Sequence, residues 1–321
     1  MPVPAEDRDR ATRIFFPDIK RKTEEVLSAG GRFVYYTSAE TATRIIKNKQ
    51  IWLRNTTIMT DYLEIEHGLE CLKASYNAEP GKLFKNALDV CFPGLTDEVE
   101  HVFNGWLQTI RQDTFISCVS EHVRDEDQHG RLSMWRAYGG QAGVALVING
   151  AVMFSETNAL NIFSSPVDYL NPEAFAARLE LIAKNMQSDV DYITSLGRET
   201  VKSLAFHLLL FAVVCTKHPG FLEEREWRNV ALPKIYTTEQ AALDIEVIRG
   251  TPQPVLKLDL QNNPEKGLVN LAIPDLLERI IIGPCEFPQV ICNAFLKLLA
   301  DAGVSEPQKK IVVSGIPLRQ L

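Results

Sequence analysis

The segment from Arg32 to Arg54 predicts a strand, a short helix and a second strand in close succession. Residues 32–37 are rich in β-branched and aromatic side chains, which favour a strand. Ser38 then stands where a helix N-cap is wanted, and residues 39–48 carry apolar side chains at helical spacing. Residues 50–54 form the second strand. Because the helix between them is so short, the ends of both strands are brought together, and the chain must build its sheet around this unit.

The remaining hydrophobic patterns switch irregularly between helical and strand-like periods. Helices are predicted over 9–29 (divided at Pro17), 63–111 (broken near 80–81 and 93–94), 132–138, 172–217 (two helices meeting near Ser188) and 290–302. Strands are predicted over 115–120, 144–148, 227–232, 255–260, 280–282 and 310–313. This order predicts an α+β fold in which helices decorate a mixed central β-sheet. We expect a single domain with an N-terminal helical extension (1–30), a first half of the sheet core (33–170), a large helical insertion (171–218) and a second half of the core (219–321).

The composition is that of an ordinary folded soluble protein, with 45% hydrophobic and 23% charged residues. The net charge of -7 argues against a strongly electrostatic nucleic-acid binder, although it is compatible with a local basic groove. The longest apolar run, 208–215, is far shorter than the roughly 20 residues of a membrane span. Residues 1–10 are polar and acidic, unlike a signal peptide. We therefore expect a cytoplasmic protein without a membrane partner.

Cysteine and histidine positions predict neither a disulfide framework nor a structural metal. The six cysteines are scattered without a C-x-x-C pair, and the six histidines form no metal-binding motif. In a cytoplasm these thiols are expected to be reduced, with several of them buried. The chain also lacks the G-x-G-x-x-G and G-x-S-x-G motifs, which disfavours Rossmann oxidoreductases and ordinary hydrolases.

Acidic and basic side chains are concentrated in the segment 223–228, directly after the helical insertion. If this segment enters a strand, side chains alternate between faces, and Glu224, Glu226 and Arg228 share one face. Two carboxylates held side by side can position a ribose hydroxyl or stabilise a cation that develops during a reaction. The alternative is a solvated edge strand whose charges pair with one another. The same alternation puts Glu223 on the opposite face, at the surface.

Further candidate binding residues end the first two strands. Tyr35, Tyr36 and Thr37 close the first strand, where a tyrosine pair can stack on a planar ring and donate a hydroxyl. Alternatively, one tyrosine belongs to the core and the other to the surface. Arg54 ends the second strand and would make a good fork for a phosphate.

Two more candidate groups come from the middle of the chain. Ser117 and Ser120 lie on the strand predicted at 115–120. Trp135 and Tyr138 are three residues apart, so they lie on one face of the short helix that carries them. That face serves either for core packing or as the wall of a base-binding pocket.

A series of short motifs runs through the chain in order. They are Tyr36-Thr37-Ser38, Met59-x-Asp61-Tyr62-x-Glu64, Phe115-x-Ser117-Cys118-x-Ser120-Glu121, Met134-Trp135-x-x-Tyr138-Gly139, Gly143-Val144-Ala145-Leu146, Glu224-x-Glu226-Trp227-Arg228, Ile281-Ile282-Gly283-Pro284 and Val313-Ser314-Gly315-Ile316-Pro317-Leu318-Arg319. Together they resemble domain of unknown function family 2971, which is found widely in bacteria. The resemblance runs from about residue 33 to 319. One departure is Thr60, where the family usually has Asn, and the resemblance by itself implies no activity.

A second resemblance, at the level of the fold, is to ADP-ribosyltransferases. Those enzymes open with a strand whose His or Arg holds the adenylate ribose of NAD, followed by a short helix. A later strand bears Ser or Tyr beside the nicotinamide, and a Glu-x-Glu stretch supplies the catalytic carboxylate. The corresponding pieces here are 35–37, 117–120 and Glu224-x-Glu226. This chain departs from that pattern because a tyrosine replaces the His or Arg, unless Arg54 takes over the phosphate role.

This second resemblance implies an NAD-dependent ADP-ribosyltransferase that releases nicotinamide and modifies a protein or nucleic-acid acceptor. A bacterial defence or toxin–antitoxin system is the setting that we associate with it. Glu226 would hold the ribose 2′-hydroxyl and stabilise the growing positive charge, and Glu224 would position or deprotonate the acceptor. NAD is the expected co-substrate, and no metal is required. The residues expected to bind NAD are Tyr35, Tyr36, Thr37, Arg54, Ser117, Ser120, Trp135, Tyr138 and Arg228.

Two other functions stay open at this point. The first is a non-catalytic nucleotide- or ligand-sensing domain in which the same pocket binds without turnover. The second is a metal-dependent nuclease in which Asp61, Glu64 and the Glu224/Glu226 pair are ligands. Asp61 also suits the N-cap of the helix that begins near Leu63, and Glu64 suits its first turn, so helix capping accounts for both residues.

Overall fold

The computed structural model describes residues 5–59, 64–154 and 159–317. The predictions made for Thr60, Asp61 and Tyr62, including the N-cap at Asp61, lie outside these residues. The chain divides into two compact units, each assembled from separate segments of sequence. The helical unit contains residues 1–25, 55–114 and 165–222, and the sheet unit contains residues 26–54, 115–164 and 223–321.

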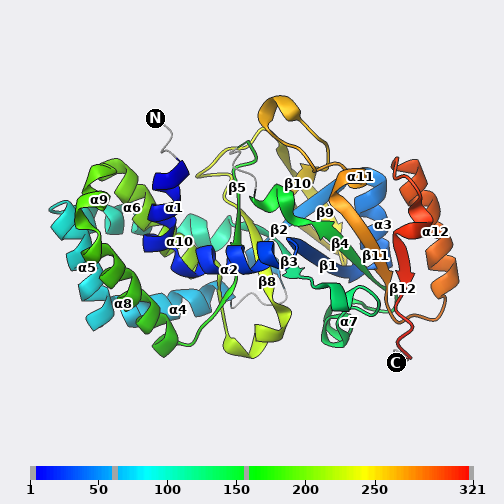
Figure 1. Cartoon of the computed structure of the whole chain (residues 1–321), viewed down its shortest axis with the longest axis horizontal. Helices are drawn as coiled ribbons and strands as arrows, with labels where there is room; N and C mark the ends of the chain where they lie inside the picture. Colours follow the sequence, from blue (N-terminus) through cyan, green and yellow to red (C-terminus); the bar gives the residue numbers. More distant parts are fainter. Residues whose placement is uncertain (1–4, 60–63, 155–158, 318–321) are drawn as a thin grey trace. The chain divides into compact units, whose positions relative to one another are not determined.

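The helices follow the predicted pattern closely (Figure 1). They are α1 (Ala5–Phe15), α2 (Pro17–Ser28), α3 (Ala39–Asn48), α4 (Glu64–Tyr76), α5 (Glu79–Cys91), α6 (Leu95–Gln112), α7 (Leu132–Tyr138), α8 (Pro172–Ser188), α9 (Val190–Ser195), α10 (Arg198–Val214), α11 (Ile273–Leu276) and α12 (Pro288–Asp301), with short 3-10 helices that include η1 (Thr56–Ile58), η2 (Arg124–Glu126) and η4 (Pro219–Glu224). Two helices were expected in the insertion, and this is wrong: α8, α9 and α10 are separate because Asp189 leaves the helical region and Gly197 has a φ of 83°.

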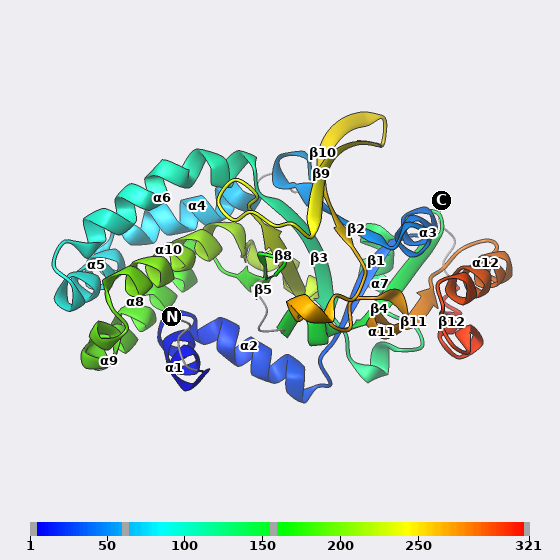
Figure 2. The same cartoon turned by 90° about the horizontal axis from the view of Figure 1, so that it is seen from above.

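The helical unit is a bundle in which α4 packs against α5, α8 and α10 (Figure 2). Gly68 of α4 allows a close approach to α10, because a Cβ at this position would lie 2.3 Å from the Val213 carbonyl oxygen. The short parallel pair β6 (Asp168–Tyr169) and β7 (Thr216–Lys217) joins the segments that flank the insertion. Among the described helices, none is long and apolar enough to cross a bilayer.

The sheet unit contains a large mixed sheet, as predicted. Its strands are β1 (Arg32–Ser38), β2 (Gln50–Asn55), β3 (Phe115–Glu121), β4 (Gly143–Asn149), β5 (Ile162–Pro166), β8 (Glu226–Ala231), β9 (Ala241–Ile248), β10 (Thr251–Asp259), β11 (Leu277–Ile282) and β12 (Ile311–Val313). The main path runs β12-β11-β4-β1-β3-β2-β10-β9, and β8 pairs with both β3 and β5. The β11–β12 pair is parallel, whereas β4 pairs with β1 and β11 in antiparallel fashion. Strands β5 and β9 were not predicted.

The predicted opening unit of strand, helix and strand is confirmed. The Ser38 hydroxyl caps α3 by accepting a hydrogen bond from the Thr41 backbone N–H at 3.2 Å. Lys49 ends the helix in the left-handed region with a φ of 52°, so β2 begins at the next residue.

Strand β3 is the branch point of the sheet, with β1, β2 and β8 as neighbours. Strand β8 pairs along nearly all of β3, from Phe115 to Ser120, and so takes one complete edge. Strand β1 pairs only with the end of β3, at Ser120 and Glu121. Since a strand has two edges, β2 must share the second edge with β1. The two opening strands, β1 and β2, therefore pair with different parts of the same edge of β3 and diverge from each other.

Each face of the sheet around β1 has its own core. Val34 and Tyr36 pack with Trp135 and other apolar residues on the face covered by α7. Leu146 and Val144 of β4 point to the opposite face and pack with residues of α3, α11 and α12. Tyr35 contacts this second core, so the neighbouring tyrosines of β1 face opposite sides.

Candidate functional site

The predicted site residues that the sheet brings together lie on β1, β3 and β8. Glu226 of β8 is directly opposite Ser120 of β3, and Ser120 is directly opposite Val34 of β1. Residues directly opposite in antiparallel strands point to the same face, and Tyr36 shares this face with Val34 because it is two residues further along. Tyr36, Ser120 and Glu226 therefore lie on one side of the sheet, the side covered by α7.

Glu226 forms an ion pair on this face with Arg228. The Arg228 Nε donates a hydrogen bond to Glu226 Oε1 at 2.9 Å. Glu226 is 6% exposed and Arg228 is 1% exposed, so both charges are almost completely removed from water. Arg228 lies opposite Cys118 of β3, on the same face as Glu226. The pair compensates two charges that would each be costly to bury alone.

Glu224 does not continue the β8 alternation, so this part of the prediction is wrong. It ends the 3-10 helix η4, and Arg225 follows with a φ of 47°, in the left-handed region. The strand begins only at Glu226. The Glu224 carboxylate instead accepts a hydrogen bond from the Tyr138 hydroxyl at 2.9 Å. Glu223 is exposed, as predicted.

The rings of Tyr36 and Trp135 are packed against each other rather than open to solvent. Their centroids are 4.8 Å apart in an edge-to-face arrangement. The Trp135 Nε1–H donates to the His129 carbonyl at 2.8 Å, and the Tyr36 hydroxyl accepts from the Arg131 backbone N–H at 2.8 Å. Burial raises the pKa of the Tyr36 phenol. Trp135 has no exposed surface, whereas Tyr138 is 42% exposed, so the two residues of this helix have different surroundings.

Glycines of two of the sequence motifs serve the packing of Trp135. A Cβ at Gly283 would lie 2.7 Å from the Trp135 ring, and one at Gly143 would lie 3.0 Å from it. Gly143 begins β4 and Gly283 directly follows β11. Both positions therefore require glycine because the indole fills the space beside the strand ends.

Three further predicted residues lie on the reverse face of the sheet or point to it. Tyr35 packs against the reverse core, and burial raises the pKa of its phenol. Thr37 follows Tyr35 by two residues and shares its face. Ser117 lies opposite Asn229 of β8. Because it precedes Ser120 by three residues, an odd number, its side chain points to the other face.

Arg54 lies on the strand that diverges from β1. It donates to the side-chain oxygen of Gln253 on β10 at 3.0 Å. Burial lowers the pKa of its guanidinium, and the nearby Tyr35 hydroxyl acts in the opposite direction.

Arg131 is a residue of the site that was not singled out from the sequence. Its guanidinium donates to the carbonyl oxygens of Glu223 and of Glu224, the latter at 3.2 Å. Glu126 accepts a hydrogen bond from Arg225 and lies 3.7 Å from Arg131 Nε. Because the Arg131 backbone N–H also binds Tyr36, this one residue links β1 to the segment that carries both glutamates. The only sequence signal was its place at the end of a charged loop.

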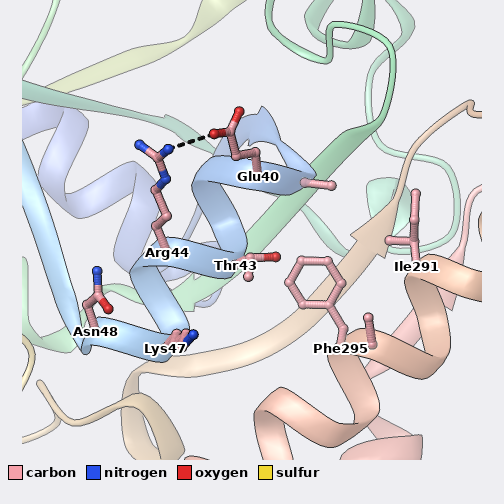
Figure 3. Close-up of a pocket in the computed structure, with 9 residues that line it drawn as sticks. Glu40, Thr43, Arg44, Lys47, Asn48, Ile291 and Phe295 are labelled. Atoms are coloured by element: carbon pink, nitrogen blue, oxygen red, sulfur yellow. Dashed lines mark hydrogen bonds and ion pairs between the residues drawn. The ribbon is translucent and has the colours of Figure 1, made fainter. Parts of the chain in front are cut away.

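A pocket lies elsewhere in the sheet unit, between α3 and α12 (Figure 3). It has a volume of about 470 Å³ and is lined by Thr43 and Lys47 of α3 and by Ile291 and Phe295 of α12. Within the described residues, no group of three or more His, Cys, Asp or Glu side chains is arranged to hold a metal ion. The metal-dependent alternative therefore gains no support from the described part of the chain.

Comparison with known proteins supports the first resemblance. Residues 134–229 match the family model described as "Protein of unknown function (DUF2971)". This stretch begins at Met134 of α7 and ends at Asn229 of β8, so it includes Trp135, Tyr138, Glu224 and Glu226. No curated protein and no solved structure matches the chain. What the chain is similar to is thus a family described only as a protein of unknown function.

Proposed function

We propose that the sheet unit binds NAD and transfers its ADP-ribose to a macromolecular acceptor, with Glu226 as the catalytic carboxylate. The observation that carries this proposal is the position of Glu226 opposite Ser120 on β3, whose other edge carries β1 with Tyr36 on the same face. The strands β1, β3 and β8 are far apart in the sequence but are neighbours in the sheet, and each carries a residue predicted for this chemistry. Had Glu226 been distant from Tyr36, the proposal would fail at this point.

The chemistry requires one well-placed carboxylate. Transfer breaks the bond between ribose C1′ and the ring nitrogen of nicotinamide, and both bonding electrons leave with nicotinamide. Positive charge then develops on the ribose, where the Glu226 carboxylate would stabilise it. A nucleophilic oxygen or nitrogen of the acceptor bonds to C1′ and gives its proton to Glu224 or to water.

The contacts of the two glutamates fit these separate tasks. Glu226 is held by Arg228 within a rigid strand, which suits a group that must meet C1′ in one orientation. Glu224 is less buried and lies outside the strand beside the exposed Tyr138, which suits contact with a bulky acceptor. The guanidiniums of Arg131 and Arg225 contact the segment that leads into β8, where they would bind the pyrophosphate.

A non-catalytic ligand-sensing function is the second candidate, favoured by the same ion pair. Glu226 and Arg228 hold each other in a buried ion pair, an arrangement that can orient a ligand without turnover. Thermal unfolding with NAD and with ADP-ribose distinguishes the two functions. A rise in melting temperature without nicotinamide release would favour sensing.

The direct test is incubation of the purified chain with adenylate-labelled NAD and a bacterial lysate or nucleic acid. We expect label transfer to a macromolecule and release of nicotinamide. Glu226→Gln should abolish both while the protein remains folded by thermal unfolding. Glu223→Gln is the matched control, because Glu223 is exposed in the same segment and should leave activity unchanged. Folded protein that neither transfers label nor releases nicotinamide in any of these mixtures would refute the proposal.

A further inference from the structure

The β9–β10 hairpin ends the sheet with an uncovered edge. Arg249 and Gly250 form its two-residue turn, with φ values of 52° and 81°, as a type I′ turn requires. Strand β10 pairs with β2 only from Val255 to Asp259, so the outer half of the hairpin extends past β2 (Figure 2). Strand β9 is the last strand of the sheet path among the described residues.

Two prolines show which backbone groups face this edge. Pro252 and Pro254 lie opposite Val247 and Ile245 in the hairpin. Proline has no N–H to give to β9, so these are the non-hydrogen-bonded pairs of the ladder. Ile245 and Val247 must therefore direct their own N–H and C=O groups outward. In agreement, the Ile245 N–H donates to the Asp244 carboxylate at 2.8 Å and not to β10.

The prolines also make the two edges of the hairpin unequal. On β10, the missing N–H groups remove donors from the outward edge, a common protection against pairing with another chain. Strand β9 contains no proline, so its edge keeps the N–H groups that β10 lacks, although the Ile245 N–H is donated to Asp244 and must exchange this partner when a strand is added. The hairpin is thus protected on one edge and open to strand addition on the other.

The side chains of β9 divide into an apolar and an acidic face. Leu243, Ile245 and Val247 are 61%, 63% and 60% exposed, which is high for large aliphatic residues at alternate positions of a strand. Asp244 and Glu246 point the other way, and Lys257 of β10 forms an ion pair with both. Two carboxylates share one ammonium group, so this cluster of three side chains carries one net negative charge. Arg54 of β2 lies on the same face, opposite Val255 of β10.

We propose that β9 binds an extended segment of another protein, which adds a strand to the sheet and whose aliphatic and basic residues alternate. Aliphatic side chains of the segment would cover the exposed apolar face, and its lysines or arginines would meet Asp244 and Glu246. A second copy of this chain fits less well. Two-fold antiparallel pairing about Ile245 would place Asp244 opposite Glu246 of the copy, and like charges in directly opposite positions are destabilising.

The test uses a synthetic acetylated peptide of alternating valine and lysine, matched to the 8 residues of β9, with binding to the full chain followed by calorimetry. We expect binding of one peptide per chain. Replacing its lysines by glutamates, or methylating the backbone nitrogens along one edge, should each weaken binding by about tenfold or more. In the protein, the substitution Ile245→Thr should also weaken peptide binding by about tenfold or more. Val290→Thr changes an equally exposed aliphatic residue of α12 and should have no effect.

Other outcomes would overturn this assignment. Equal binding of the lysine and glutamate peptides would remove the charge argument, and full binding of the methylated peptide would exclude strand addition. Light scattering of the chain alone measures whether two copies of the chain associate. A dimer that Ile245→Thr converts to monomer would mean that β9 pairs with itself and would replace the proposed partner.

Discussion

Arg228 donates a hydrogen bond to Glu226 from two residues further along the same strand, and both side chains are nearly inaccessible to water. Removing one member of such a pair takes away a charge that compensates the burial of the other. We therefore expect Arg228→Met to lower the free energy of unfolding by about 3–5 kcal/mol. The double variant Glu226→Leu/Arg228→Met should recover most of this loss. Urea denaturation of the three proteins measures both effects, and a single variant as stable as the wild type would show that the pair is solvated.

The space beside Trp135 leads to a second prediction. Gly283→Ala would place a Cβ 2.7 Å from the buried indole, between rigid groups, and should destabilise the protein by about 1–3 kcal/mol. Gly105→Ala is a matched control in an exposed helix interior, because its Cβ meets nothing within 4 Å. This control should stabilise α6 by up to about 1 kcal/mol. Thermal unfolding of both variants is sufficient, and a neutral Gly283→Ala would contradict the packing argument.

The two tyrosines that contact the site should respond differently to loss of the hydroxyl. Tyr36→Phe leaves the Arg131 backbone N–H without its partner and should cost about 1 kcal/mol of stability. Tyr138→Phe breaks a hydrogen bond at a residue that is 42% exposed, so its stability should change by less than about 0.5 kcal/mol.

Under the proposed function, Tyr138→Phe has a second consequence. If Glu224 positions the acceptor, loss of its contact with Tyr138 should reduce label transfer to the macromolecule but leave hydrolysis of NAD to ADP-ribose and nicotinamide unchanged. Measuring nicotinamide release and label transfer in parallel separates these steps. A proportional fall in both would instead place Glu224 in the cleavage step.

Local signals were sufficient to predict most of the elements, although β5, β9 and α11 were not predicted. The other corrections come from backbone geometry and from distant contacts. The Ser38 cap and the apolar spacing of α3 identify the opening unit because both are encoded within a few residues. The positive φ of Arg225, which removes Glu224 from the strand, has no such signal. Trp135 and Tyr138 were correctly placed on one helix. That Trp135 is enclosed depends on Gly143 and Gly283, one on a later strand and one after β11.

Strand β9 was not predicted, although its alternating pattern is present in the sequence. Leu243, Ile245 and Val247 alternate with Asp244 and Glu246, which is the signature of a half-buried strand. The structure confirms the strand but leaves its apolar face exposed. The division into two units could not be predicted, because α4 packs with α8 and α10 from more than a hundred residues away. Packing of this kind depends on close approaches such as that at Gly68.

The buried His122 predicts how stability depends on pH. Burial lowers the pKa of its imidazole below the ordinary value of 6.5, although the Asp127 carboxylate accepts a hydrogen bond from Nε2–H at 2.9 Å and acts in the opposite direction. The unfolded chain therefore binds a proton at this histidine before the folded chain does. The contribution of His122 is fully present above pH 6.5 and is lost as the pH falls from 6.5 towards the folded pKa.

Urea denaturation should thus show that the free energy of unfolding decreases as the pH is lowered from about 7.5 to about 5, and His122→Gln should flatten that dependence. The pKa of His207 is also lowered by burial, so it provides a residual slope. His207→Gln removes that part and leaves the part due to His122. An unchanged slope in His122→Gln would mean that the imidazole has the same pKa in the folded and unfolded chains. A steeper slope would mean that Glu126 and Asp127 keep the buried imidazole protonated in the folded protein, which reverses the sign argued from burial.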